Sequence, residues 1–403
     1  MRDVPIQRVM VLSAVAALLA SACSTASTAT TTAATTTVAV DPTLPFGEEL
    51  QSALDGVLEV EDPMGFTLAV MVPGYQPWVG VAGVSEPGVP ITADMAFGIG
   101  SATKSFIAAL VLQLAEEGRL SLDDRLNQWL PDYPNVDNTA TIRQLLNHTS
   151  GIFQPNHHPD FWPTIFADGG RVWTDEEIYS IFLLEPYAAK GTEWNYSNAN
   201  YMMLGQIIEA ATGSSVSTEL RERFFEPLGL TSAFYLSEET PSGAVAEGWF
   251  DVSPYAPEVD SDPALEPFSQ FPWLATMAEA GGIFASSHDL ATWAQALWGS
   301  GRVLSTASME EMLDFVAPQP DDERSALIAG YGLGAVRFNP ELFDGAPLVI
   351  GHSGGALFYS AAAMYLPDYG VTIGSALNSD HDVFGAIMTE VTRLITTNVE
   401  PLS

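Results

Sequence analysis

The sequence predicts an α/β (α+β) fold: an antiparallel sheet built from both chain ends and flanked by helices, with an inserted, mostly helical region. Apolar runs of strand length occur between residues 66 and 100 and return from about residue 330 onward. The gaps between neighbouring runs are short, which is typical of antiparallel strands. Residues 121–329 instead show helical periodicity with long loops. Both chain ends are therefore expected to share one sheet.

The N-terminal part supplies a helix, three strands and a second helix. In order, we predict an amphipathic helix at 47–60, strands at 66–72 and 78–85 joined by a Pro-Gly turn, a strand at 96–100, and a buried helix at 106–115. Gly118 is a suitable C-terminal stop for that helix.

The rest of the chain completes the prediction. Candidate helices lie at 122–130, 175–184, 198–212, 217–226, 288–298 and 306–316, candidate strands at 331–338, 348–351, 357–366 and 371–378, and a terminal helix at 382–396. We assign residues 46–120 plus 330–400 to a sheet domain and residues 121–329 to the inserted helical region. A binding site is expected where the two meet, because pockets often form at such junctions.

The first 45 residues are expected to lie outside the fold. Residues 1–22 combine Arg2 and Arg8 with a short apolar run, which indicates an export signal rather than a membrane span. Cys23 follows small residues and is the only cysteine, so this end resembles a bacterial lipobox. The alternative is ordinary cleavage, which leaves a free thiol. Residues 23–45 are Ser/Thr-rich and predict a flexible tether.

The charge of the chain limits its partners. The 403 residues include 50 acidic and 14 basic side chains, for a net charge of −36. Such a chain has no basic patch for nucleic acid, so we expect no nucleic-acid partner. The surface is expected to be strongly acidic and solvated, and the protein to be a monomer.

Lys104 is one of only two lysines and follows Ser101 by three residues, at the start of the predicted buried helix. At that spacing both side chains lie on one helix face. Burial disfavours the charged form of a lysine, which can then act as a base near neutral pH. A serine hydroxyl can thus be activated without histidine. Alone, this short motif is weak.

Two further motifs carry groups suited to the same chemistry. Tyr196-Ser197-Asn198 precedes an apolar helical run, where a phenol can exchange protons with serine and an asparagine can bind a substrate amide. The alternative is a helix cap rich in Ser and Asn. His352-Ser353-Gly354-Gly355 lies between predicted strands, where small residues let a substrate backbone approach. The alternative is a glycine-rich hairpin.

Together and in this order, the three motifs resemble the S-x-x-K, S-D-N and K-T-G set of the serine β-lactamase and penicillin-binding family. The variant is similar to the branch that holds D-alanyl-D-alanine carboxypeptidases, D-aminopeptidases, class C β-lactamases and β-lactamase-like esterases. Further stretches at 120–124, 145–151, 280–283 and 331–334 fit that branch, and the resemblance covers about residues 50–397.

The resemblance implies a β-lactamase/transpeptidase-like fold and a serine hydrolase that forms an acyl-enzyme without cofactor or metal. Ser101 would attack, and Lys104 and Tyr196 would transfer its proton. The backbone N–H groups of Ser101 and Gly355 would form the oxyanion hole. The residues implied to bind substrate are Asn198, His352, Ser353 and Gly354. Class C β-lactamases usually carry lysine at the position of His352, and a partly charged histidine would hold a substrate carboxylate less firmly.

These observations lead us to expect a D-alanyl-D-alanine carboxypeptidase-like enzyme on cell-wall peptides. The alternative is a carboxylesterase or lactone hydrolase that uses the same site, and a β-lactamase or a non-catalytic binding lipoprotein is favoured less. The expected ligands are a small peptide or ester and β-lactams. We expect an exported protein, either a cell-envelope lipoprotein that contacts the membrane through its lipid anchor only, or a secreted or periplasmic one.

The loop Asn156-His157-His158-Pro159-Asp160-Phe161-Trp162 invites a comparison with metal sites. Its spacing matches no closed structural zinc site, so a substrate-facing or surface loop is favoured and no metal is expected.

Overall fold

The computed structural model describes residues 42–61, 65–249, 270–343, 348–355, 357–379 and 384–402. The sequence predictions for the export signal, Cys23 and nearly all of the tether therefore lie outside the described residues. Within the described ranges, no helix combines the length and apolar character that crossing a membrane requires.

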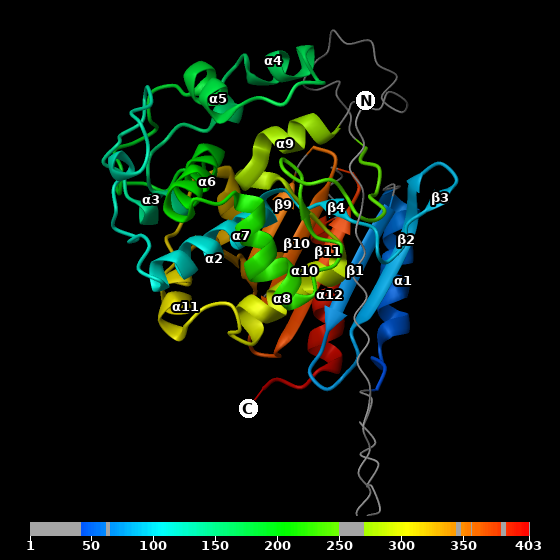
Figure 1. The fold of residues 1–403 in the computed structure, drawn as a ribbon. Coiled ribbons are helices and arrows are strands. Elements are labelled where there is room, and N and C mark those ends of the chain that lie inside the picture. Colours follow the sequence, from blue (N-terminus) through cyan, green and yellow to red (C-terminus); the bar gives the residue numbers. More distant parts are fainter. Residues whose placement is uncertain are drawn as a thin grey trace, which may run out of the picture. The chain divides into compact units, whose positions relative to one another are not determined.

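The main sheet has eight strands in the order β3-β2-β1-β11-β10-β9-β8-β7, all antiparallel (Figure 1). The two chain ends meet at its centre, where Phe66 of β1 pairs with Leu377 of β11. The predicted fold class is thereby confirmed. The strands are β1 (Gly65–Met71), β2 (Trp78–Glu86), β3 (Val89–Pro90), β7 (Ile328–Tyr331), β8 (Val336–Phe338), β9 (Ile350–Gly355), β10 (Ser360–Leu366) and β11 (Val371–Leu377).

Helices cover both faces of this sheet. On one face lie α1 (Gly47–Glu61) and α12 (Phe384–Asn398), which pack against each other. On the other face α10 (Ser287–Ala294) contacts β1, β10 and β11. The side chains of β1 point alternately to the two faces of the sheet. Phe66 packs into the core beneath α1, and the Thr67 hydroxyl forms a hydrogen bond with the Ser287 hydroxyl at 2.7 Å. Because helices cover both faces, β1 is buried over nearly its whole length.

The inserted region is mainly helical and packs into a second apolar core. Besides α10, the helices around this core are α2 (Thr103–Glu116), which precedes the inserted region, and α3 (Ile142–Leu146), α4 (Phe161–Ala167), α5 (Asp175–Phe182), α6 (Asn198–Thr212), α7 (Val216–Leu220), α8 (Glu226–Leu228), α9 (Gln270–Gly281) and α11 (Thr306–Met312). Short turns of other helix types are η1 (Gly100–Ala102), η2 (Leu126–Gln128), η3 (Pro155–His157), η4 (Arg221–Phe225), η5 (Gln295–Gly299), η6 (Glu323–Ala326) and η7 (Pro340–Phe343).

The strand that leads to Ser101 lies in a different sheet from the one predicted. β4 (Phe97–Gly98) pairs with β6 (Ile283–Ala285), which also pairs with β5 (Phe234–Tyr235), in a separate three-stranded sheet. Gly98 fits there because a Cβ atom at this position would lie only 2.7 Å from the Tyr359 ring. This small sheet ties the start of α2 to the end of α9.

Two other sequence predictions are wrong. The helix expected at 122–130 is only the single turn η2, because Arg125 is extended and bridges to Thr141. The strand expected at 331–338 is the hairpin β7–β8, which turns through Gly334 at φ 70°. The bridge to Thr141 in the first case and the turn at Gly334 in the second outweigh the local apolar pattern.

Candidate active site

Ser101 lies in η1, the turn that leads directly into α2, and Lys104 follows in the first turn of α2. Gly100 precedes them at φ 50°, where a Cβ atom would lie 3.0 Å from the carbonyl oxygen of Gly355. Only glycine combines this backbone angle with so close an approach. The sharp turn exposes the Ser101 side chain at the pocket while α2 remains buried.

Lys104 is fully buried and is held by two bonds. Its Nζ donates to Ser101 Oγ at 3.0 Å and to the carbonyl oxygen of Ala280 at 2.5 Å. Burial, together with the charge of Arg324, lowers the pKa of Lys104 well below its usual value. The amine is therefore suited to receive the proton of Ser101.

Tyr196 approaches the nucleophile from the loop before α6. Its hydroxyl donates to Ser101 Oγ at 2.8 Å, and its ring centre lies 5.1 Å from Lys104 Nζ. Enclosure raises the pKa of Tyr196 to about 12, so the phenol keeps its proton at neutral pH. It can then act as an acid toward a leaving group.

His148 packs against the ring of Tyr196. This fully buried side chain packs on the Tyr196 ring with 4.2 Å between ring centres, and its Nδ1 lies 2.9 Å from Asn200 Nδ2. His148 adopts φ 59°. Burial lowers the pKa of His148 well below its usual value, which makes it a neutral positioning residue.

The third motif forms the end of β9, which runs against the start of α2. A Cβ atom at Gly354 would lie 2.0 Å from the carbonyl oxygen of Ile99 and 2.6 Å from the Ser101 nitrogen. Gly355 follows and lines the same pocket as Ser101. The structure thus brings together the two backbone segments that the resemblance assigns to the oxyanion hole.

Asn198 begins α6 and also lines the pocket. Its backbone nitrogen donates to Gln154 Oε1 at 2.8 Å. Among the described residues, nothing hydrogen-bonds its buried Oδ1 atom. A buried acceptor without a partner is suited to receive a substrate N–H group.

His352 belongs to β9. The side chain is buried, its Nδ1 donates to the Ser353 carbonyl oxygen at 2.6 Å, and Tyr331 Oη lies 2.9 Å from its Nε2. Burial, aided by the charge of Lys104, lowers the pKa of His352 to about 3. Burial therefore favours the neutral ring, and both ring nitrogens have protein partners, which does not favour a charge-based contact with a substrate carboxylate. A role for His352 in substrate binding stays a prediction.

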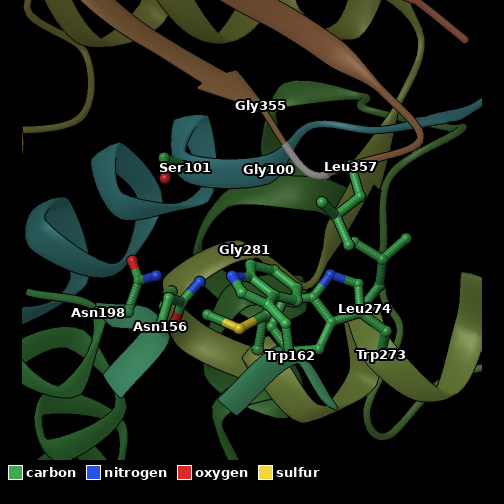
Figure 2. A pocket seen from close by; sticks show the side chains of 12 residues that line it. Gly100, Ser101, Asn156, Trp162, Asn198, Trp273, Leu274, Gly281, Gly355 and Leu357 are labelled. Carbon is green, nitrogen blue, oxygen red and sulfur yellow. The ribbon is translucent and has the colours of Figure 1, made fainter. Parts of the chain in front are cut away.

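The pocket beside Ser101 has a volume of about 150 Å³. Figure 2 shows the side chains of Trp162, Trp273, Leu274 and Leu357 gathered at one end, with Asn156 and Asn198 toward Ser101. The apolar end is suited to a hydrophobic substituent, and the amides to a peptide group.

Sequence reasoning missed most of this pocket wall. Trp273, Leu274 and Met277 belong to α9, which the sequence did not predict because its apolar residues show no clear period. The loop at 156–162, which the sequence predicts to be substrate-facing or on the surface, contributes Asn156 and Trp162 to the pocket lining. His157 Nδ1 lies 2.7 Å from Tyr187 Oη, and His158 Nδ1 accepts from the Asp160 nitrogen.

A further residue that the sequence did not single out is Arg324 of η6. Its guanidinium carbon lies 5.0 Å from the centre of the Tyr196 ring. No local motif marks it, because η6 is more than a hundred residues from Tyr196 in the chain.

The fold and the serine–lysine–tyrosine arrangement fit one class of protein, the serine hydrolases. The family model described as Beta-lactamase matches residues 64–397, and this chain belongs to that family. The assignment made from the three motifs is confirmed.

Two penicillin-binding proteins and an esterase are among the relatives. Penicillin-binding protein 4 of Amycolatopsis lactamdurans is 31% identical over 76% of this chain and 77% of the relative. PbpX of Bacillus subtilis (strain 168), named as a penicillin-binding protein, is 32% identical over 55% of this chain, which spans only 50% of the relative. Esterase EstB of Burkholderia gladioli is 29% identical over 40% of this chain and 43% of the relative.

The solved structures include a D-stereospecific amidohydrolase from Streptomyces sp. It superposes with a TM-score of 0.72 at 29% identity, over 86% of this chain and 98% of that chain. The similarity therefore extends over almost the whole of that enzyme.

Proposed function

We propose that this chain hydrolyses the peptide or amide bond that follows a D-configured residue, through an acyl-enzyme on Ser101. D-alanyl-D-alanine peptides are the simplest substrates of this class. One observation carries the proposal: Ser101 Oγ lies 3.0 Å from a buried lysine amine and 2.8 Å from a protonated phenol, beside an apolar pocket.

Acylation uses the two groups in different roles. Neutral Lys104 receives the proton of Ser101 as Oγ forms its bond to the substrate carbonyl carbon. Tyr196 gives its proton to the leaving nitrogen as the carbon–nitrogen bond breaks. The proton on Lys104 then returns to the Tyr196 oxygen, which restores both groups.

The tetrahedral intermediate carries its negative charge on the former carbonyl oxygen. The backbone nitrogens of Ser101 and Gly355 are the donors that the family resemblance assigns to it, and such a donor supplies about 3 kcal/mol. In deacylation, water attacks the ester carbonyl carbon and Lys104 receives a proton from it; Lys104 then gives this proton to Ser101 Oγ as the carbon–oxygen bond breaks.

The D-configuration is supported by what the similar proteins are called. One solved neighbour is named as a D-stereospecific amidohydrolase, and two relatives as penicillin-binding proteins. The two tryptophans and Leu274 in the pocket support an apolar side chain on the acyl part of the substrate.

Ester or lactone hydrolysis is the second candidate. The relative named EstB supports it. The pocket supports it as well, because its lining has no charged side chain and can receive an uncharged substrate. An ester needs little help from an acid to release its alcohol, so the role of Tyr196 as acid separates the two candidates.

The test is to assay the purified protein with an acyl-D-phenylalanyl-D-alanine peptide, its L,L counterpart and p-nitrophenyl esters. We expect the D,D-peptide to be cleaved, and Ser101→Ala to lose both cleavage and labelling by a fluorophosphonate probe. A protein that cleaves esters but neither peptide would establish the esterase function instead. Labelling that persists in Ser101→Ala would exclude Ser101 as the nucleophile.

A further inference from the structure

We propose that Glu279 is a positioning residue of this active site. Its protonated carboxyl group holds the turn that presents the Ala280 carbonyl oxygen to Lys104, and its ionisation at alkaline pH loosens that turn and slows acylation. This inference rests on the proposed function, from which it takes the roles of Ser101 and Lys104. It holds for a peptide and for an ester alike, because both acylate the same serine.

The Ala280 carbonyl oxygen connects the turn at the end of α9 to the nucleophile. It accepts from Lys104 Nζ at 2.5 Å, and the same nitrogen donates to Ser101 Oγ at 3.0 Å. The position of the amine is therefore set in part by this carbonyl group. Glu279 directly precedes Ala280 in the chain, so a movement of Glu279 changes the direction from which Lys104 meets the serine.

The backbone of this turn adopts a conformation that its surroundings must hold. Ala278, the residue before Glu279, has φ 38° and ψ −117° at a kink within α9. A residue other than glycine rarely adopts such angles, and it keeps them only where neighbouring contacts fix them. The Gly282 nitrogen closes the turn by donating to the Ala278 carbonyl oxygen at 2.5 Å. A side chain that anchors the turn to other elements adds to this bond.

The buried Glu279 side chain is such an anchor, because it contacts both α6 and β5. A Cβ atom at Gly205 of α6 would lie 2.1 Å from Glu279 Oε1, so glycine leaves the room that this carboxyl group fills. The Tyr235 hydroxyl of β5 hydrogen-bonds the carboxyl group, and the Tyr235 backbone pairs with Ile283, which follows the turn. Tyr235 thus holds the turn at both of its ends.

The surroundings of Glu279 favour its protonated form. Nothing in the described ranges hydrogen-bonds its buried Oε2 atom, and no cation there forms an ion pair with it. Burial, then repulsion from Asp175, raises the pKa of Glu279 well above its usual value. On α2 the facing cation is Lys104, which contacts the backbone of Ala280. The other titratable groups around the carboxyl group are acids and phenols: Asp175 and Tyr179 of α5, Glu209 of α6, Tyr235 of β5, Glu238 after β5, and Tyr133.

Ionisation leaves Glu279 as an uncompensated charge in the protein interior. Such a charge costs far more than a buried neutral carboxyl group, because nothing nearby replaces the water that it loses. The carboxylate therefore favours arrangements in which it reaches solvent, and these require the side chain to leave the space beside Gly205. Because Glu279 and Ala280 share a peptide bond, the Ala280 carbonyl group moves as well, and Lys104 loses its fixed position.

The test measures labelling of Ser101 by a fluorophosphonate probe between about pH 6 and 10, in the wild type, Glu279→Gln and Asp175→Asn. The maximal labelling rate of the wild type should fall at alkaline pH by up to about tenfold per pH unit, as one ionisation requires. Glu279→Gln should keep at alkaline pH the rate that it has at neutral pH, because the amide does not ionise. Asp175→Asn should move the fall to lower pH, because loss of a neighbouring negative charge makes Glu279 easier to ionise.

Controls separate this positioning role from other effects. Lys104 and Tyr196 do not produce the alkaline fall, since loss of a proton activates Lys104 and the pKa of Tyr196 is about 12. Glu247→Gln is the matched variant, because burial also raises the pKa of this partly buried carboxyl group, but its backbone nitrogen bonds Ser85 of β2. It should leave the pH profile unchanged. Circular dichroism at each pH verifies the fold, and probe affinity is fitted separately from the maximal rate.

The outcomes distinguish the two proposals. The same pH profile in the wild type and Glu279→Gln would overturn the positioning role while the proposed hydrolysis stands. A change in probe affinity without a change in maximal rate would also overturn it, as would a shift of the fall to higher pH in Asp175→Asn. A wild type that the probe does not label, or labelling that persists in Ser101→Ala, would instead refute the proposed function.

Discussion

At the scale of single residues, burial controls the protonation of Lys104. A lysine with no exposed surface tends to lose its proton, and the Ala280 carbonyl oxygen fixes where the resulting amine lies. His352 is subject to the same physics with a different result. Its two ring nitrogens have protein partners, and burial favours the neutral imidazole.

The first prediction at this scale is that His352→Lys destabilises the fold. An ammonium cannot accept the hydrogen bond that Tyr331 donates to the His352 ring, and burial disfavours its charge. We expect a loss of about 3 kcal/mol in the free energy of unfolding, measured by urea denaturation. His352→Gln, which keeps a donor and an acceptor, is the comparison. A lysine variant as stable as the wild type, with tighter binding of acidic substrates, would restore the original expectation.

At the scale of elements, the active site is where β9 meets the start of α2. The approach is so close that two positions have no room for a side chain: Gly100 in η1 and Gly354 in β9. The strand therefore fixes the serine as well as pairing in the sheet.

We predict that Gly354→Ala displaces this junction. A Cβ atom 2.0 Å from the Ile99 carbonyl oxygen meets backbone, which cannot rotate away, so we expect a loss of about 2 kcal/mol in stability and strongly reduced acylation. Thermal unfolding and the rate of fluorophosphonate labelling measure the two effects. Gly243→Ala is the control, since nothing lies within 4 Å of a Cβ atom there. Equal labelling rates in both variants would contradict the role of the β9 contact.

A second element-level feature is a group of acidic side chains between α5, α6 and α9. Glu279 of α9 is buried, and the facing groups are Asp175 and Tyr179 of α5, Glu209 of α6 and Tyr235 of β5. Burial, then repulsion from Asp175, raises the pKa of Glu279 well above its usual value, and burial raises the pKa of Asp175 to about 6. Glu279 precedes Ala280, whose carbonyl oxygen holds Lys104.

Glu279→Gln should therefore stabilise the protein at alkaline pH. A carboxyl group whose pKa is raised on folding contributes stability below its unfolded pKa and loses it as pH rises through the folded pKa. The amide does not ionise, so we expect similar melting temperatures near pH 4.5 and an advantage of roughly 2–4 °C or more for the variant once Glu279 ionises. Melting curves from pH 4.5 to 9 give the test. A pH-independent difference between the two proteins would show that Glu279 does not ionise over that range.

At the scale of the whole molecule, the described fold begins near residue 42 and the preceding segment has a composition unlike the rest. We propose that residues 1–22 direct export and that Cys23 carries a lipid anchor followed by the tether. A hydrolase of cell-wall peptides needs this location, because its substrate lies outside the cytoplasm. The strongly acidic surface is consistent with a solvated domain held away from the membrane.

The corresponding prediction is that the mature protein begins at an acylated Cys23. Mass spectrometry of protein from its native host should show the N-terminal peptide with acyl chains, and Cys23→Ser should release the protein into the medium. Protein that keeps an unmodified thiol and is released without the substitution would support ordinary cleavage instead.

The sequence determined the family and the sheet shared by both chain ends, and it predicted that Ser101, Lys104 and Tyr196 lie together, as they do. These features follow from short motifs and apolar periods, which are local properties. Helix α6 was predicted at its observed limits for the same reason. Only the tertiary structure decided how burial shifts the pKa values of the site groups and which residues line the pocket beside Ser101. Burial lowers the pKa of His352, and Arg324 lies beside the site because η6 packs on the Tyr196 ring. α9 forms the pocket without an amphipathic signal, since its surroundings bury it on most sides. Solvent exposure and the field of distant charges depend on the folded chain, and no local pattern contains them.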